Sequence, residues 1–303
     1  MAGPCIPRRT AAALFDNSVH SRTLSLGCST LDACLGGGID MCGVTEVAGE
    51  AGAGKTQLVL QLLLQSQLPT PLGGLGGGAI YLHSDSSYSG PAMKRLDTMA
   101  QEFAVRHAAL QADSELLKQH ILVMQVDSPD ELWQVVDQRI PALLPTTQVR
   151  LLVVDSIGGL YRTLADDISA SRASAHAQRA QQLMRLAARL KEISDQFNIA
   201  TVVTNQVSDK PANALAHRSA APWELGACGM ADGSARVPAL GMAWACCVNT
   251  RLILTRQQRG STHGPGGWQS MSGHSVSADE EWPQTSSWNR RLHVVWSSRL
   301  PES

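Results

Sequence analysis

The residues Gly49-Glu50-Ala51-Gly52-Ala53-Gly54-Lys55-Thr56 constrain this chain more than any other stretch. They match the pattern G-x-x-x-x-G-K-[ST], and they lie between a strand-like segment, 44–48, and a run of Leu and Gln at helical spacing. Glycines let such a loop turn its N–H groups toward an anion, and the following helix adds its unpaired N–H groups and positive dipole end. The alternative is a glycine-rich turn without a ligand. The complete pattern favours a nucleoside-triphosphate site, with Lys55 on the β/γ-phosphates and the Thr56 hydroxyl on Mg²⁺.

Strand and helix patterns alternate along the rest of the chain. Strands are predicted at 79–83, 121–126, 149–155 and 199–204, and helices at 29–35 (capped by Ser29), 91–106, 129–140 and 173–197. An apolar segment at 240–247 and strands at 250–255 and 291–296 follow, and the last two are expected to pair as a hairpin. The alternation predicts an α/β fold, with a mostly parallel central sheet flanked by helices and a C-terminal antiparallel hairpin.

Three segments lack this periodicity. Residues 1–22 are polar except for Ala11 to Phe15, which is either a linker segment that docks on this domain or another subunit, or part of a tail. Residues 207–238 are predicted to be a long loop, and residues 260–287, rich in Gly, Ser, Thr and His, a disordered insertion. We therefore expect a tail or linker at 1–22 and one large domain at 23–303.

Composition excludes several classes of protein. The net charge of −1 provides no global basic field for nucleic acid, so such binding would depend on local loops or on a partner. The seven cysteines include no C-x-x-C pair, which indicates reduced thiols. We find no apolar run long enough for a membrane span and no signal-peptide core, so we expect a soluble intracellular protein.

Polar residues at strand ends extend the predicted phosphate site. Asp155 follows the LLVV strand, where it is either a second Mg²⁺ anchor or an ordinary turn residue. Asp85 follows the AIYLHS strand and is either the group that orients the attacking water or a solvated loop residue. Gln206 follows the VVTN strand end, and it is either a contact to the γ-phosphate or a polar residue that caps the strand.

Several sequence blocks also occur in the order found in one protein family. They are LSLGCSTLDACLGGGI, GEAGAGKTQL, LLVVDSIGGLYR, TVVTNQVSD and PALGMAWACCVNTRLILTR. Together they resemble the RecA-like strand-exchange recombinases, and within that family the eukaryotic recombinase paralogues. The Gly-Gly-Leu loop, AIYLHSD and ALG-x-AWA-x-x-VN-x-R are similar to one branch of those paralogues. The resemblance covers about 24–301, apart from the 260–287 insertion.

The resemblance implies a RecA-like P-loop ATPase core and a role for individual residues. Positions 49–56 match the family's phosphate loop, Asp155 its Mg²⁺ anchor, Gln206 its γ-phosphate sensor and Arg95 its arginine against adenine. Residues 166–172 and 207–238 fall on its two DNA-binding loops. Pro301 falls near the segment that caps ATP across a subunit interface.

Four departures from the family pattern point to a regulatory subunit. Asp85 stands where the family has its catalytic Glu, one methylene longer, so the attacking water would be held poorly. The second loop has three cations offset by three carboxylates, which predicts weak DNA binding by this chain alone. We expect the family's N-terminal helical domain and the last strand of its C-terminal sheet to be absent, and the missing strand would leave an open edge.

These features leave three hypotheses. The first is a weak DNA-dependent ATPase, a nuclear mediator of double-strand-break repair and meiotic recombination and a sensor of DNA damage, which uses ATP and Mg²⁺. It would act on single-stranded DNA as a heterodimer with a sister paralogue and help the main recombinase to load. The second is a scaffold that binds ATP with little or no hydrolysis. The third, an unrelated P-loop kinase of small molecules, is disfavoured by the long loop after Gln206.

Overall fold

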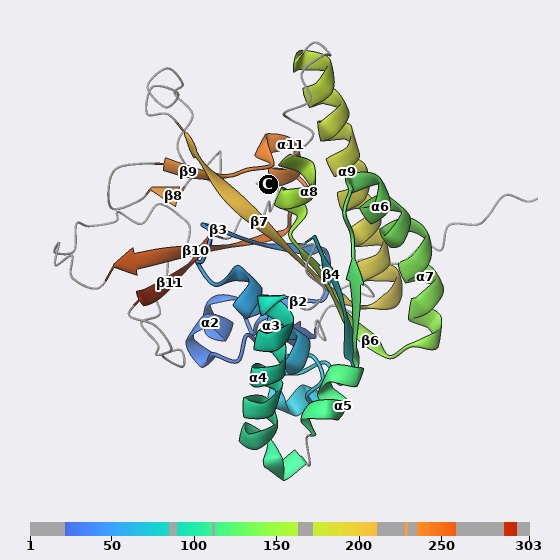
Figure 1. Cartoon of the computed structure of the whole chain (residues 1–303), viewed down its shortest axis with the longest axis vertical. Coiled ribbons are helices and arrows are strands. Elements are labelled where there is room, and N and C mark those ends of the chain that lie inside the picture. The colour runs from blue at the N-terminus through green and yellow to red at the C-terminus, as the bar shows by residue number, and fades with distance from the viewer. Residues whose placement is uncertain are drawn as a thin grey trace, which may run out of the picture.

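A parallel sheet organises the fold of the computed structural model (Figure 1), which describes residues 22–84, 90–110, 113–162, 172–210, 228–229, 235–258 and 288–295. Six of the described strands run parallel in the order β10-β3-β7-β6-β4-β5, and β11 pairs antiparallel with β10 at the outer edge. The bounds are β3 Val44–Gly49, β4 Gly78–His83, β5 Ile121–Gln125, β6 Val149–Asp155, β7 Ala200–Lys210, β10 Thr250–Gln258 and β11 Trp288–Val295. The predicted RecA-like architecture and its C-terminal hairpin are confirmed.

Helices cover both faces of this sheet (Figure 1). One face packs against α2 (Ser29–Cys34), α3 (Lys55–Gln65), α4 (Pro91–Arg106) and α5 (Ser114–Gln119). The other packs against α6 (Pro129–Gln134), α7 (Ile140–Leu143), α8 (Ile157–Arg162), α9 (Arg172–Phe197) and α11 (Gly241–Ala245).

Strand β6 shows why the middle of the sheet is apolar without interruption. Leu151 and Val153 belong to the hydrophobic cluster of the first face, and Leu152 and Val154 to that of the second. Because successive side chains point to opposite faces, the part of a strand that is covered on both sides favours apolar residues at consecutive positions, as in Leu151 to Val154. This confirms the prediction for residues 149–155.

Short elements complete the described structure. They are β1 (Thr23–Leu24) paired with β2 (Ile39–Asp40), β8 (Cys228–Gly229), β9 (Ala235–Pro238), the 3₁₀ turns Thr70–Leu72, Ala108–Leu110 and Leu144–Thr146, and the π-helical turn Val135–Arg139.

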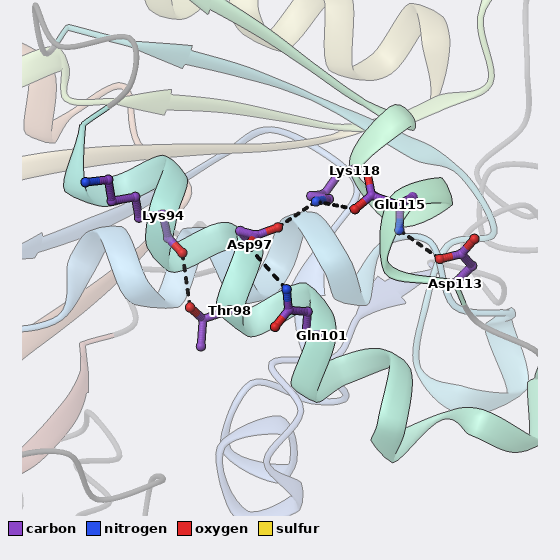
Figure 2. A network of polar contacts seen from close by, with 7 residues as sticks. All are labelled: Lys94, Asp97, Thr98, Gln101, Asp113, Glu115 and Lys118. Atoms are coloured by element: carbon purple, nitrogen blue, oxygen red, sulfur yellow. Dashed lines mark hydrogen bonds and ion pairs between the residues drawn. The ribbon is translucent and has the colours of Figure 1, made fainter.

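A surface network ties α5 to α4, as Figure 2 shows. The Lys118 ammonium lies 2.5 Å from the Asp97 carboxylate and 2.8 Å from Glu115. Asp113 caps α5 by accepting a hydrogen bond from the Glu115 N–H, and Gln101 donates to the second Asp97 oxygen. The Lys118–Asp97 pair fastens α5, which the sequence analysis did not predict, beside the longer α4, whereas the Lys118–Glu115 pair lies within α5.

Two helix predictions need correction. Ser29 does not cap α2: the N-cap is Cys28, whose side chain makes no capping hydrogen bond to the first turn, and Asp32 accepts hydrogen bonds from the Leu26 N–H and the Ser25 hydroxyl. The helix predicted at 129–140 contains the π-helical turn Val135–Arg139. Pro141 lacks the N–H that would bond the Asp137 carbonyl, and Arg189 donates to that carbonyl at 3.2 Å.

The long loop predicted at 207–238 is wrong at both of its ends. Strand β7 continues past Gln206 to Lys210, and its last four residues pair antiparallel with β9, Val207 opposite Pro238 and Lys210 opposite Ala235. This pairing satisfies backbone groups that an extended segment would otherwise leave unpaired. Residues 1–21, residues 211–227 and 230–234 of that loop, and the 260–287 insertion lie outside the described residues.

Candidate nucleotide-binding site

The glycine-rich loop joins the end of β3 to the start of α3. Gly52 and Gly54 have φ angles of 74° and 102°, in the left-handed region that glycine adopts without strain. A Cβ on Gly49 would lie 2.5 Å from the Leu254 carbonyl oxygen of β10, so this position has no room for a side chain. Gly54 is the N-cap of α3 and provides no side chain to cap the first turn. The loop therefore has the strand-to-helix geometry that its sequence predicts.

Lys55 folds back over the loop. Its Nζ atom donates to the carbonyl oxygens of Gly49 and Glu50 at 2.8 and 2.7 Å. Burial lowers the pKa of the Lys55 ammonium, and the negative charges of Asp155 and Glu50 oppose that shift. A partly desolvated cation at a helix N-terminus is well placed to bind an anion.

Strand register brings the other predicted residues to the same edge of the sheet. Gly49 lies directly opposite Gln206, and Asp155 opposite His83. The predicted phosphate loop, Asp155 and Gln206 thus gather at the carboxyl ends of adjacent parallel strands, where open α/β sheets bind ligands.

Hydroxyl groups hold both oxygens of the Asp155 carboxylate. Oδ1 accepts a hydrogen bond from Thr204 at 2.5 Å and Oδ2 accepts one from Tyr81 at 3.0 Å. The peptide bond from Asp155 to Ser156 is cis, and the Ser84 hydroxyl accepts from the Ser156 N–H at 3.2 Å. Neighbouring strands therefore fix the orientation of this carboxylate.

Arg95 lies on α4, beside the start of α3. Its Nη1 atom is 3.5 Å from the Gln57 side-chain oxygen. Both residues line a groove of about 900 Å³ that continues between α3 and α4 past Gln61 and Phe103 to His107. The predicted adenine contact thus borders a concave surface next to the phosphate loop.

Oxygen donors suited to Mg²⁺ are present at this edge. Thr56 is partly buried in the first turn of α3, and Asp155 provides the carboxylate. Within the described ranges no group of three His, Cys, Asp or Glu residues is arranged to hold a metal. A hydroxyl and a carboxylate are ligands that suit Mg²⁺, which usually takes one or two protein ligands together with water and substrate phosphates.

Several predicted functional positions are not described. Asp85 lies outside the described residues, as do 166–171 of the first predicted DNA loop, most of the second and Pro301. No helix in the described ranges is long and apolar enough to span a bilayer.

The sequence analysis missed a buried polar cluster directly behind the phosphate loop. Glu46 of β3 is fully buried, and its Oε1 atom accepts hydrogen bonds from Asn205 at 2.7 Å and from the Trp244 indole at 3.0 Å. Arg251 of β10 pairs with the other Glu46 oxygen. The available signal was a Glu and an Arg inside apolar strands, since such residues are rarely buried without a partner.

Comparison with known proteins identifies the family. The family model described as Rad51 matches residues 19–262. The DNA repair protein XRCC3 homolog of Arabidopsis thaliana is 32% identical over 304 residues, 96% of this chain and 91% of the relative. DNA repair protein XRCC3 of Bos taurus is 33% identical, over 94% of this chain and 71% of the relative. DNA repair protein rhp57 of Schizosaccharomyces pombe is 30% identical, over 82% of this chain and 73% of the relative. The family model covers most of the chain and agrees with the fold and the sequence blocks, so the chain belongs to the Rad51 family.

Proposed function

We propose that this chain is an ATP-binding subunit that acts in DNA repair by homologous recombination. The observation that supports this most is the arrangement at one sheet edge, where Lys55 lies within the glycine loop beside Asp155 and Gln206. Membership of the Rad51 family and the similarity to DNA repair proteins support the biological role.

In this proposal the phosphate loop, residues 49–56, binds the triphosphate of ATP. The Lys55 ammonium exchanges its two carbonyl partners for phosphate oxygens, and the backbone N–H groups of the loop face the same anion. The Thr56 hydroxyl and, through water, the Asp155 carboxylate would hold Mg²⁺, which neutralises phosphate charge when bound.

Three further residues complete the proposed site. Arg95, which lines the groove between α3 and α4, would lie against the adenine. Gln206 contacts the γ-phosphate and reports its loss to the segment that follows β7. Asp85 orients the attacking water, and its short side chain gives weak turnover.

The larger assembly is also part of the proposal. We infer a single ATPase domain over 23–303 after a linker at 1–22, and a heterodimer with a sister paralogue that binds single-stranded DNA and assists the main recombinase. The protein would act in the nucleus, in repair of double-strand breaks, in meiotic recombination and as an ATP-dependent sensor of DNA damage. Because this chain's second predicted DNA loop balances its cations with carboxylates, the partner would supply much of the DNA affinity.

A second candidate is a scaffold that binds ATP and hardly hydrolyses it. The identity of residue 85 favours it, because Asp there is shorter than the Glu of the family pattern. Membership of the Rad51 family argues against a kinase of small molecules.

The test is ATP turnover by the purified chain, with and without single-stranded DNA, next to the Lys55→Ala variant. Turnover that DNA stimulates and Lys55→Ala abolishes is the expected result. Tight ATP binding without turnover, also in the presence of a sister paralogue, would favour the scaffold. No binding of ATP by the wild-type chain would refute both candidates.

A further inference from the structure

The buried cluster around Glu46 joins four elements next to the proposed γ-phosphate position. Glu46 lies on β3, three residues before the phosphate loop, and its partners Asn205, Trp244 and Arg251 lie on β7, α11 and β10. We propose that Asn205 is a positioning residue that couples β3 to Gln206, so that the chain distinguishes ATP from ADP. This inference rests on the proposed ATP site.

Asn205 uses both ends of its side-chain amide. Its Nδ2 atom donates to Glu46 Oε1 at 2.7 Å, and its Oδ1 atom accepts from the backbone N–H of Gln206 at 2.8 Å. The residue is fully buried, so water does not compete for these bonds. One rigid amide therefore links the strand that leads into the phosphate loop to the backbone of the proposed γ-phosphate sensor.

Neighbouring elements leave Asn205 little freedom to move. A Cβ on Gly158 of α8 would lie 2.5 Å from Asn205 Oδ1 and 3.1 Å from the Gln206 nitrogen, so the backbone of α8 closes the far side of the amide. Helix α8 begins two residues after Asp155, at Ile157. Asn205 thus lies between the strand of the phosphate loop and the segment that follows the proposed Mg²⁺ anchor.

The other partners hold the carboxylate that Asn205 contacts. Arg251, buried like Glu46, forms an ion pair with Oε2, and the Trp244 indole shares Oε1 with Asn205. A carboxylate fixed from two other sides gives Asn205 a single position in which both of its hydrogen bonds form. If Gln206 shifts toward a γ-phosphate, Asn205 must shift with it and strain its hydrogen bond to Glu46. Alternatively, that hydrogen bond already holds Gln206 in the position that contacts the phosphate.

Asn205→Ala and Trp244→Phe make a matched pair of variants. Each removes one hydrogen bond to the same Glu46 oxygen, but only Asn205→Ala also removes the acceptor for the Gln206 N–H. The measurement is the ratio of dissociation constants for ADP and for a non-hydrolysable ATP analogue in Mg²⁺ buffer, with the thermal unfolding of each variant recorded beside it.

We expect Asn205→Ala to reduce this ratio about tenfold with ADP affinity nearly unchanged, and Trp244→Phe to leave the ratio at the wild-type value. A merely structural role predicts equal ratios in both variants, and that result would overturn the proposal. If Asn205→Ala does not fold, Asn205→Thr gives the same decision, because it has a similar volume but is too short to join Glu46 Oε1 to the Gln206 N–H. A wild-type chain that binds neither nucleotide refutes the ATP site itself, which is a different outcome.

Discussion

At the scale of single residues, the proposed ATP site depends on the Lys55 ammonium, which is partly buried in an environment that disfavours its charge. Lys55 is partly buried, and its Nζ atom donates to two carbonyl oxygens of its own loop. Burial lowers the pKa of the ammonium, while the charges of Asp155 and Glu50 act against that shift. An anion that enters the loop would remove this penalty, so the charge is available for ligand binding.

As the pH rises, ATP affinity should therefore begin to decrease at a lower pH than it would if Lys55 were an exposed lysine. The affinity is complete below the folded-state pKa of Lys55 and falls as the pH rises through it, which begins below the ordinary value of 10.5. The free energy of unfolding without ligand should increase as the pH rises through this range, because the unfolded chain binds the Lys55 proton more tightly than the folded chain does. Nucleotide titrations from neutral pH to about pH 10 test this.

The Lys55→Arg variant is the control for that titration, since its guanidinium stays charged over the range. It should bind ATP less tightly at neutral pH, with the alkaline decrease absent. The same decrease in both proteins would show that another group is responsible.

The residues of the proposed phosphate site follow from the sequence because their pattern is local. Lys55 and Thr56 lie in one short motif, and Asp155 and Gln206 follow apolar strands that are easy to recognise. Glu46 could not be assigned in this way. Its ion-pair partner Arg251 is 205 positions away, and only the pairing of β3 with β10 brings the two together.

At the scale of elements, α8 fits closely against the end of β7. Its two consecutive glycines, Gly158 and Gly159, face different surroundings. The first approaches Asn205 and the backbone of Gln206, and the second approaches the hydroxyls of Ser156 and Ser84 at 3.2 and 3.3 Å.

Alanine at these two positions should have opposite effects. Gly158→Ala places a methyl group 2.5 Å from Asn205 Oδ1, beside backbone that cannot withdraw, and should cost about 1–3 kcal/mol of the free energy of unfolding. Gly159→Ala meets rotatable hydroxyls and should be neutral or stabilise by about 0.5–1 kcal/mol, since alanine favours helix. Urea unfolding of both variants measures this; equal costs would contradict the close packing at Gly158.

Ion pairs between elements should differ in strength according to their burial. Arg251→Met leaves the fully buried Glu46 carboxylate without its cation and should cost about 3–5 kcal/mol. Lys118→Met removes the Asp97 pair that joins α5 to α4 and the Glu115 pair within α5 (Figure 2); water and salt reach both pairs, so stability should change little. Denaturant unfolding at low and high salt compares them; a large effect of Lys118→Met would contradict this reasoning.

The elements that the sequence predicted best are long and periodic. Helix α4 has the predicted bounds, Pro91–Arg106, and β6 and α9 differ from prediction by at most one residue. The short helix α8 was missed because Gly158 and Gly159 disfavour helix locally, and its packing against β7 decides the outcome. The extension of β7 was missed because its partner β9 follows only after a long intervening segment.

At the scale of the whole molecule, the proposed site depends on the assembled sheet. Residues of β3, β6 and β7 form it, together with the first turn of α3. Because these segments are far apart in the sequence, a ligand held there binds the folded chain and not the unfolded one.

Mg²⁺–ATP should therefore raise the unfolding temperature of the whole chain. At a free concentration of 100 times the dissociation constant, the expected gain is about 2.7 kcal/mol, or a shift of several degrees. Thermal unfolding of wild type and Lys55→Ala, with and without nucleotide, measures it. An equal shift in Lys55→Ala would mean that ATP binds elsewhere.

The place of β3 in the sheet has a consequence for how the chain folds. Every residue of β3 is buried, yet its neighbours β7 and β10 both come from much later in the sequence, with Val44 opposite Thr201 and Thr45 opposite Thr250. Such distant pairings form slowly, because chain entropy is lost before any contact compensates for it. During synthesis β3 emerges early and keeps two open edges until the second half of the chain has left the ribosome. We therefore expect the segment that leads into the phosphate loop to be among the last to gain its neighbours, and to be a site where nascent chains can aggregate.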